Sequence, residues 1–385
     1  MICLQDKSCK HSGFMNGKGV VLYMNHKHLL VFTGGTISSV QKDNEIICNQ
    51  KTFELLNDCH LSDFDILEPA DILSENMTPQ LIFQIYKKII EKLKEKNYRS
   101  MIITHGTDTM AYTAQLGALL FSQLPFPVVF LGSKLPAGHP NMDGKINFKH
   151  ACKFVEQVDS GVFVISRQQD GNDVVFAAES IQQADFIGDD FSAFQNNIFG
   201  WFEKEILIRN TSFQPYSQIN QKNFQNTNAK EFIQLFTNSS SDLQPSQMRP
   251  ISFSYPFQYI PLPFQRLFKK EINKDKPGIF LVSAYVGQDY SLFDLEKYSG
   301  NYILHQMYHS GTACMYGESN QQLSSFAERC KKNGKHLFIA PLYRNRTPYE
   351  TTAALLKEHV IPLYDMPVER AWAILTLASW LDDFD

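Results

Sequence analysis

The sequence predicts an α/β fold, with a larger N-terminal domain built on a doubly wound, mostly parallel sheet and a smaller C-terminal α/β domain. From about residue 29 onward, short apolar runs alternate with longer segments of helical period, which is the pattern of βαβ units. The chain has 385 residues, 43% of them hydrophobic, so it exceeds one average domain and can bury two cores. We expect an N-terminal extension at 1–28, domains at 29–209 and 276–385, and an irregular connection at 210–275.

The larger domain is expected to alternate buried strands with helices. Its helix at 79–94 carries apolar residues three and four apart, charged residues on the other face, and Thr78 as its N-cap. This helix therefore packs one side on the sheet. The expected strands are 29–32, 64–67, 100–104, 127–131 and 161–166, and the other expected helices are 109–124 and 145–158.

The rest of the chain is expected to hold a connection and a second α/β unit. Residues 210–275 are rich in Asn, Gln, Ser and Phe, a composition typical of irregular structure between domains. The boundary is expected near 276–278 (Lys-Pro-Gly). The unit after it has expected strands at 279–282, 302–304 and 336–340 and expected helices at 322–332 and 368–381.

Charge and cysteine content exclude several classes of partner. The formal net charge of −4, from 36 basic and 40 acidic residues, gives no basic surface of the kind that nucleic acids or anionic membranes require. We therefore expect a small-molecule partner, no nucleic acid and no membrane. The seven cysteines are scattered without a Cys-x-x-Cys pair, which predicts free thiols in a reducing compartment. The first residues contain no apolar signal segment, so we expect a cytoplasmic protein.

Two histidine pairs have the spacing of metal ligands, but neither belongs to a complete metal motif. The pairs are His26 with His28 and His305 with His309, and no glutamate accompanies them in the pattern of a zinc hydrolase. The glycine-rich runs also lack the spacings of nucleotide-binding loops. We therefore expect no metal and no other cofactor.

Two threonine-glycine runs carry the strongest functional signal. Residues 33–37 (Thr-Gly-Gly-Thr-Ile) and 105–109 (His-Gly-Thr-Asp-Thr) each follow a predicted strand. The loops at the carboxyl ends of parallel strands form the ligand crevice of an open α/β sheet, so we expect Thr36 and Thr107 to face one pocket. A threonine hydroxyl needs a base and oxyanion donors to attack an amide, and the preceding glycines let the backbone approach a ligand. Taken alone, Gly-Gly-Thr after a strand is more often a helix N-cap.

Together the two runs resemble the asparaginase family, in particular its bacterial cytoplasmic type I branch, and also the related amidotransferase subunit that acts on misacylated glutamyl-tRNA. Residues 105–114 (HGTDTMAYTA) are similar to the type I motif. Residues 77–79 (Met-Thr-Pro) resemble the segment after the family's substrate-carboxylate loop, and 143–147 (Asp-Gly-Lys-Ile-Asn) resemble a further family element. The similarity extends over about 29–381.

The resemblance implies an amidohydrolase that removes ammonia from asparagine or a related side-chain amide through a threonine nucleophile. Matched motif to motif, Thr36 is the nucleophile, Thr107 the second hydroxyl and Asp108 a ligand of the substrate's amino group. The positions matched to substrate binding are Gly35, Ser74, Glu75 and Gly106. The resemblance also implies a homodimer or a homotetramer.

Two catalytic positions depart from the family pattern. The family lysine that completes a proton relay is matched by Phe176, whose side chain carries no transferable proton. The family's activating tyrosine lies in a stretch that reads 44–47 (Asn-Glu-Ile-Ile) in this chain. Lys134, in the loop after the strand at 127–131, is either a replacement for the lysine or a solvated loop residue. Glu45 is either a base or, more often for such a loop, a solvated glutamate.

The sequence is therefore compatible with three functions. The first is an active asparaginase-like amidohydrolase. The second is a catalytically degenerate protein that binds a small amide or amino-acid ligand as a sensor or an assembly partner, which the absent lysine and tyrosine favour. The third is a changed substrate choice, with Phe176 adding an apolar wall for a bulkier or peptidic amide. The family's subunit-bridging Gly-Asn element is matched by Gly311 and Thr312, which leaves contacts from a neighbouring subunit open.

Overall fold

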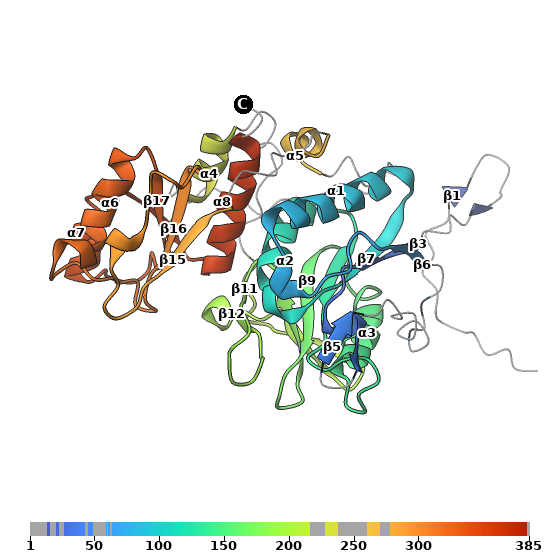
Figure 1. Cartoon of the computed structure of the whole chain (residues 1–385). Coiled ribbons are helices and arrows are strands. Elements are labelled where there is room, and N and C mark those ends of the chain that lie inside the picture. The colour runs from blue at the N-terminus through green and yellow to red at the C-terminus, as the bar shows by residue number, and fades with distance from the viewer. Residues whose placement is uncertain are drawn as a thin grey trace, which may run out of the picture.

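The computed structural model describes residues 14–15, 21–22, 27–42, 45–48, 59, 61, 64–215, 228–237, 260–269 and 278–382. Its main elements are an eight-stranded sheet and a four-stranded sheet, each with helices packed against it (Figure 1). The predicted fold class is confirmed, because a large, mainly parallel sheet is followed by a smaller C-terminal one. Among these residues no helix is both long and apolar enough to cross a membrane.

The large sheet has five parallel strands and an antiparallel extension on one edge. Its strand order is β14-β13-β10-β9-β8-β7-β3-β6. The parallel strands are β3 (Lys27–Phe32), β6 (Phe64–Leu67), β7 (Tyr98–Thr104), β8 (Pro127–Leu131) and β9 (Gly161–Arg167), and the antiparallel ones are β10 (Asp173–Ala177), β13 (Gly200–Glu203) and β14 (Ile206–Arg209). Because β3 lies between β6 and β7, the strand order reverses there, and a topological switch point lies at the carboxyl ends of β3 and β7.

Apolar side chains alternate across the parallel strands and meet helices on both faces. Leu29 of β3 belongs to the core beneath α1 (Pro79–Glu95) and α2 (Thr107–Phe121). The next residue, Leu30, belongs to the core beneath α3 (Asp143–Phe154). Burial on both faces explains why these strands read as continuous apolar runs in the sequence.

The N-termini of α1 and α2 follow from local chemistry. The Leu81 N–H donates to the Thr78 hydroxyl at 3.2 Å, so Thr78 caps α1 as predicted. Pro79 occupies the first turn, where its missing N–H leaves no bond unmade. Helix α2 begins at Thr107, two residues earlier than predicted, because Gly106 is extended and the threonine itself opens the helix.

The smaller sheet is wholly parallel and follows chain order. Its strands are β15 (Phe280–Ser283), β16 (Tyr302–Gln306), β17 (His336–Leu342) and β18 (Val360–Tyr364). Helix α6 (Leu323–Lys332) packs on one face through Leu323 and Phe326. Helix α8 (Val368–Asp382) covers the other face, and the short α7 (Glu350–Leu355) precedes β18.

Helix α8 lies between the two domains and belongs to a core that both share. Its Trp380 packs edge-on against Phe83 of α1, with ring centroids 5.2 Å apart. Trp372 packs in the same way against Tyr112 of α2, also at 5.2 Å. In Figure 1, α8 stands in red between the C-terminal strands and the helices α1 and α2. A continuous apolar core therefore joins the two sheets.

Aromatic burial gives structure to the segment 210–275, which was predicted to be irregular. Its described part contains α4 (Ala229–Thr237) and α5 (Leu262–Leu267). Phe232 and Phe264 of these helices are buried in the core around α8, and this tertiary contact cannot be predicted from the composition of the segment alone. The other short elements are β1 (Phe14–Met15), β2 (Val21–Leu22), β4 (Ser39–Lys42), β5 (Glu45–Cys48), β11 (Ile181–Gln182) and β12 (Ser192–Ala193).

The prediction of free thiols is wrong at two cysteines. Cys59 and Cys152 form a disulfide, with Cα atoms 6.2 Å apart, that joins the segment before β6 to helix α3. The two cysteines are 93 positions apart in the sequence, so only the fold brings them together and their spacing gave no sign of pairing. Cys314 and Cys330 are free thiols, as predicted.

Candidate active site

The two threonine-glycine runs lie at the switch point of the large sheet. Residues 33–37 follow β3 and residues 105–109 follow β7, and these strands are hydrogen-bonded neighbours. The Thr33 hydroxyl donates to the Thr104 carbonyl at 2.8 Å, which fastens the end of β3 to β7. The Gly35 N–H donates to the Ile72 carbonyl at 2.8 Å, which fastens the same loop to the segment after β6.

Glycines bring the two runs into backbone contact. Gly35 has a φ of +81°, a region that other L-residues rarely adopt, and a β-carbon built on it would lie 2.4 Å from the Gly106 nitrogen. A β-carbon on Gly106 would lie 2.3 Å from the Ser74 hydroxyl oxygen. No larger residue fits at either position without moving a loop, so glycine at both positions allows the loops of Thr36 and Thr107 to touch.

A third loop, after β6, meets the second run. Ser74 opens the 3-10 turn η3 (Ser74–Asn76), is buried, and donates its hydroxyl to the Asp108 carboxylate at 3.3 Å. Thr109 donates its own hydroxyl to the Ser74 carbonyl at 3.0 Å. Glu75 extends from the same turn and is exposed. The predicted binding residue Ser74 and the predicted catalytic residue Asp108 are therefore in direct contact.

The two candidate nucleophilic hydroxyls lie at the starts of helical turns. Thr36 opens the 3-10 turn η1 (Thr36–Ser38) and Thr107 opens α2, and both residues are partly exposed. Neither hydroxyl has a hydrogen-bond partner among the described residues. A β-carbon on Gly132 would lie 3.1 Å from the Thr107 methyl carbon, so the loop after β8 borders this threonine. Both hydroxyls are thus open to a bound ligand.

His105 is a neutral, buried histidine behind the second run. Its Nδ1 lies 2.8 Å from the Gly106 carbonyl oxygen, which only accepts, so Nδ1 carries the proton. Its Nε2 is buried without a partner in the described part of the chain. Burial lowers the pKa of His105 to about 4, so the ring is neutral at neutral pH and holds the glycine loop as a donor.

Helix α3 holds the loop after β8. The Asp143 carboxylate accepts the Ser133 hydroxyl at 2.9 Å and the Lys134 N–H at 3.0 Å. Asn147 donates its side-chain amide to the Gly132 carbonyl at 3.0 Å. The element at 143–147 is therefore structural: its acid and amide fix the loop that borders the second threonine.

The residues of this site lie in a part of the chain that matches a known protein family. Residues 27–212, which include every predicted site residue, match the N-terminal domain of asparaginase. This part of the chain is therefore similar to the asparaginase family. The large sheet, the two threonine-glycine runs and the Ser74 loop all lie within the matched residues.

Curated relatives of the asparaginase family match a shorter part of the chain. An L-asparaginase of Thermococcus kodakarensis is 32% identical over 143 residues, which is 36% of this chain and 43% of that protein. A component of the glutamyl-tRNA(Gln) amidotransferase of Saccharolobus islandicus is 32% identical over 152 residues, which is 37% of this chain and 34% of that protein. The match spans less than half the length of each relative.

Solved asparaginase structures share the fold over nearly the whole chain. The thermostable L-asparaginase from Thermococcus kodakarensis has a TM-score of 0.64 at 17% identity, and the match covers 93% of both chains. A probable cytoplasmic L-asparaginase from Campylobacter jejuni has a TM-score of 0.61 at 16% identity, covering 94% of this chain and 100% of that chain. At these identities the likeness establishes the fold, including that of the C-terminal domain.

The structure also places the residues that were predicted to depart from the asparaginase pattern or to replace its lysine and tyrosine. Phe176 lies on β10, is 2% exposed and packs in the core beneath α1 and α2. Lys134 directs its ammonium group to the Asp190 carboxylate and donates to the Gly188 carbonyl at 3.2 Å. Glu45 lies on β5 and is exposed. Phe176, the residue predicted to match the family's relay lysine, is therefore a core residue.

Two further residues, Gln183 and Glu369, form a chain of contacts to Asp108 that the sequence did not predict. Gln183 donates its side-chain amide to the Asp108 carbonyl, and its own N–H donates to the Glu369 carboxylate at 2.7 Å. Glu369 is 3% exposed and lies in the first turn of α8. The sequence predicted neither contact, because only the packing of α8 against α2 brings Glu369 to Gln183.

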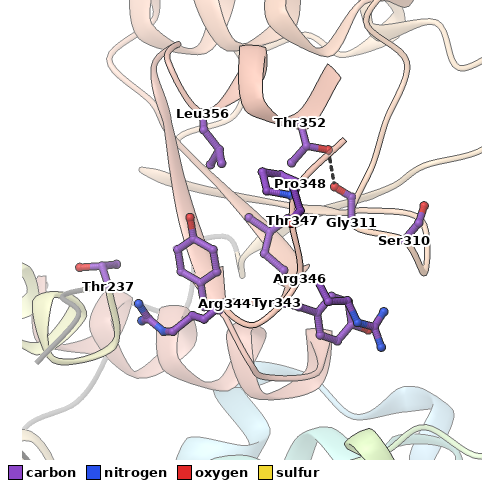
Figure 2. A pocket seen from close by; sticks show the side chains of 12 residues that line it. Thr237, Ser310, Gly311, Tyr343, Arg344, Arg346, Thr347, Pro348, Thr352 and Leu356 are labelled. Carbon is purple, nitrogen blue, oxygen red and sulfur yellow. Dashed lines mark hydrogen bonds between the residues drawn. The ribbon is translucent and has the colours of Figure 1, made fainter. Parts of the chain in front are cut away.

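A cavity of about 490 Å³ at the carboxyl ends of the C-terminal strands is separate from the threonine site (Figure 2). None of the predicted catalytic or substrate-binding residues lines it. Gly311, which was predicted to match the family's subunit-bridging element, lines the cavity and accepts the Thr352 hydroxyl at 2.9 Å. The Arg344 guanidinium lies 4.6 Å from the centre of the Tyr364 ring in the same cavity.

Proposed function

We propose that this protein is an asparaginase-like amidohydrolase that hydrolyses the side-chain amide of asparagine, or a related amide, to the acid and ammonia. One observation carries the proposal: the Gly35 and Gly106 backbones are in contact, while Ser74 of a third loop bonds to Asp108. This arrangement supports one shared site for two threonine hydroxyls, an acid and a serine. The asparaginase family of the N-terminal domain supports the same class of reaction.

In this proposal Thr36 attacks the carbonyl carbon of the substrate amide. The C–N bond breaks, and the nitrogen leaves as ammonia with the proton of the threonine hydroxyl. Water then hydrolyses the ester on Thr36, which restores the hydroxyl and gives the acid. Thr107 assists with its hydroxyl, and Asp108 holds the substrate's amino group. The first N–H groups of α2 have no partners within the helix and are candidate donors to the developing oxyanion.

We further propose that Lys134 takes over the proton relay of the absent family lysine. It lies two residues after Gly132, which borders Thr107. Its ammonium group is paired with Asp190, so the role requires this pair to open when substrate binds. Lys134→Met should then abolish turnover while leaving substrate binding in place. An unchanged rate would dismiss the role.

Ligand binding without turnover is a second candidate function, and the relay positions favour it. Phe176 offers no proton, and the Lys134 ammonium group is engaged by Asp190. In that case a small amide or amino acid binds at the same loops, and the protein acts as a sensor or an assembly partner. An apolar wall for bulkier amides is not supported at position 176, because the phenyl ring is 2% exposed.

Ammonia release from asparagine by the purified protein distinguishes the two functions. Thr36→Ala and Thr107→Val are measured beside it, with glutamine as the second substrate. Release that disappears in both variants supports the amidohydrolase. No release, together with an asparagine-dependent rise in melting temperature that Asp108→Ala removes, supports ligand binding. Neither release nor a shift contradicts both functions for these two amides.

We also propose a homodimer or homotetramer in the cytoplasm. A relative is named as a subunit of an amidotransferase, and a solved structure of the same fold is described as probably cytoplasmic. Light scattering of the purified protein tests the assembly, and a monomeric mass at micromolar concentration would contradict it. Thiol trapping in cells tests the location, because a reducing cytoplasm should keep Cys59 and Cys152 at least partly reduced.

A further inference from the structure

A buried acid from the C-terminal domain lies two contacts away from the threonine site. Glu369 occupies the first turn of α8, where this helix packs against α2, and is 3% exposed. Its Oε1 accepts the Gln183 N–H at 2.7 Å, and its Oε2 is buried without a partner in the described part of the chain. Carboxyl groups are rarely buried with so few hydrogen bonds, which indicates a role beyond packing.

Gln183 extends this contact to the first turn of α2. Its side-chain amide donates to the Asp108 carbonyl. The carboxylate of Asp108 accepts the Ser74 hydroxyl at 3.3 Å, so one residue is held from two directions. Thr107 is the neighbour of Asp108 in the same turn. The position of this turn therefore depends on two contacts. One is Ser74, from the loop after β6, and the other is Gln183, which is itself bonded to Glu369 of the C-terminal domain.

We propose that Glu369 is a positioning residue of the threonine site, which fixes Gln183 and through it the turn that carries Thr107 and Asp108. The kinetic part of this inference rests on the proposed amidohydrolase function. The structural part does not, because it concerns only where the first turn of α2 lies. The C-terminal domain thereby contributes to the site from within the same chain.

Toward Gln183 the Glu369 carboxyl group acts as a hydrogen-bond acceptor. Burial raises the pKa of Glu369, which favours its neutral form. Tyr112 of α2 faces it, and burial together with the nearby carboxyl raises the pKa of Tyr112 to about 12. Arg370, the next residue of α8, donates its guanidinium to the Gln115 carbonyl at 3.3 Å. A glutamine at position 369 can supply the same acceptor oxygen without a charge.

Three substitutions separate positioning from general packing. Glu369→Gln keeps the acceptor and should leave kcat and KM for asparagine within about two-fold of wild type. Glu369→Leu leaves the Gln183 N–H without a partner and should raise KM at least about ten-fold, because Asp108 binds the substrate. Arg370→Met removes the bond to the Gln115 carbonyl and keeps Glu369 and both bonds of Gln183, so it should lower the melting temperature without raising KM.

A fourth variant guards against a Glu369→Leu protein that does not fold. Gln183→Leu keeps the backbone bond to Glu369 and loses the bond to the Asp108 carbonyl, so it should raise KM to a similar extent. If the two residues act in one chain of contacts, the double variant should be no worse than either single one. Additive losses, or equal losses in Glu369→Gln and Glu369→Leu, would overturn the proposal.

Hydrogen exchange provides a readout that does not need activity. Amide exchange in the peptide covering 105–112 should be at least about ten-fold faster in Gln183→Leu and Glu369→Leu than in wild type, and unchanged in Glu369→Gln and Arg370→Met. If the wild type releases no ammonia from any amide, the proposed function fails and this exchange pattern still decides the inference. Equal exchange in all variants would overturn it.

Discussion

Protonation of His105 should destabilise the N-terminal domain as the pH falls. The bond from Nδ1 to the Gly106 carbonyl fixes the neutral tautomer, and a proton on the buried Nε2 would have no acceptor among the described residues. Burial lowers the pKa of His105 from 6.5 to about 4. Between pH 6.5 and about pH 4 the unfolded chain binds a proton at His105 that the folded chain does not bind. The contribution of neutral His105 to the free energy of unfolding is therefore fully present above pH 6.5 and is lost as the pH falls toward about 4. The loss is about 2 kcal/mol at about pH 5 and about 3 kcal/mol near pH 4.

Urea unfolding of wild type and His105→Asn at about pH 7.5 and about pH 5 measures this loss. Asparagine keeps an N–H near the Nδ1 position and does not titrate, so the variant should lose about 2 kcal/mol less than wild type over this interval. His305 on β16, whose pKa burial also lowers to about 4, gives a parallel measurement with His305→Gln in the other domain. An identical pH dependence in wild type and His105→Asn would refute the reasoning, because the folded state would then accept the proton.

Three further perturbations test the supports of the site. Gly35→Ala places a β-carbon 2.4 Å from a backbone nitrogen, so we expect at least about a hundred-fold loss of ammonia release, whereas Gly138→Ala, at a similar φ but in open space, should keep it. Asp143→Ala removes the acceptor of the loop after β8 and should lower the free energy of unfolding by about 2 kcal/mol, measured in urea. Cys59→Ser should lower it by about 2–5 kcal/mol under oxidising conditions, and an effect no larger than that of Cys314→Ser would contradict a structural disulfide.

The buried parallel strands could be predicted from the sequence because nearly all of their residues are apolar. Strand β8 is fully buried, so each of its side chains is apolar and its predicted bounds equal the observed ones. The helices α4 and α5 could not be predicted in the same way. Phe232 and Phe264 decide their structure by packing around α8, and that contact depends on the whole fold rather than on local composition.

The sequence predicts that the two threonine-glycine loops lie side by side, whereas it does not predict the long-range contacts that hold the surrounding structure. Two buried strands followed by glycine-rich loops predict a common carboxyl edge. The disulfide, in contrast, joins residues 93 positions apart, and the bond between Gln183 and Glu369 joins residues 186 positions apart. No periodicity or spacing in the chain records such contacts. The sequence predicted a departure from the family pattern at Phe176 and a candidate replacement at Lys134, but it did not show that Phe176 is buried or that Lys134 pairs with Asp190.

The residues predicted to keep the asparaginase pattern and the residue predicted to depart from it, Phe176, lie in different layers of the domain. The loops of Thr36 and Thr107 are held by glycine backbones and by Ser74, and none of these contacts involves Phe176 in the core beneath α1 and α2. We therefore expect ligand binding and proton relay to be separable in this chain. Phe176→Lys should not restore the family relay, because it would bury an unpaired charge among apolar side chains and destabilise the domain before it could serve catalysis. Lys134 follows Gly132, which borders Thr107, so Lys134→Met is the more informative substitution for testing the proposed relay.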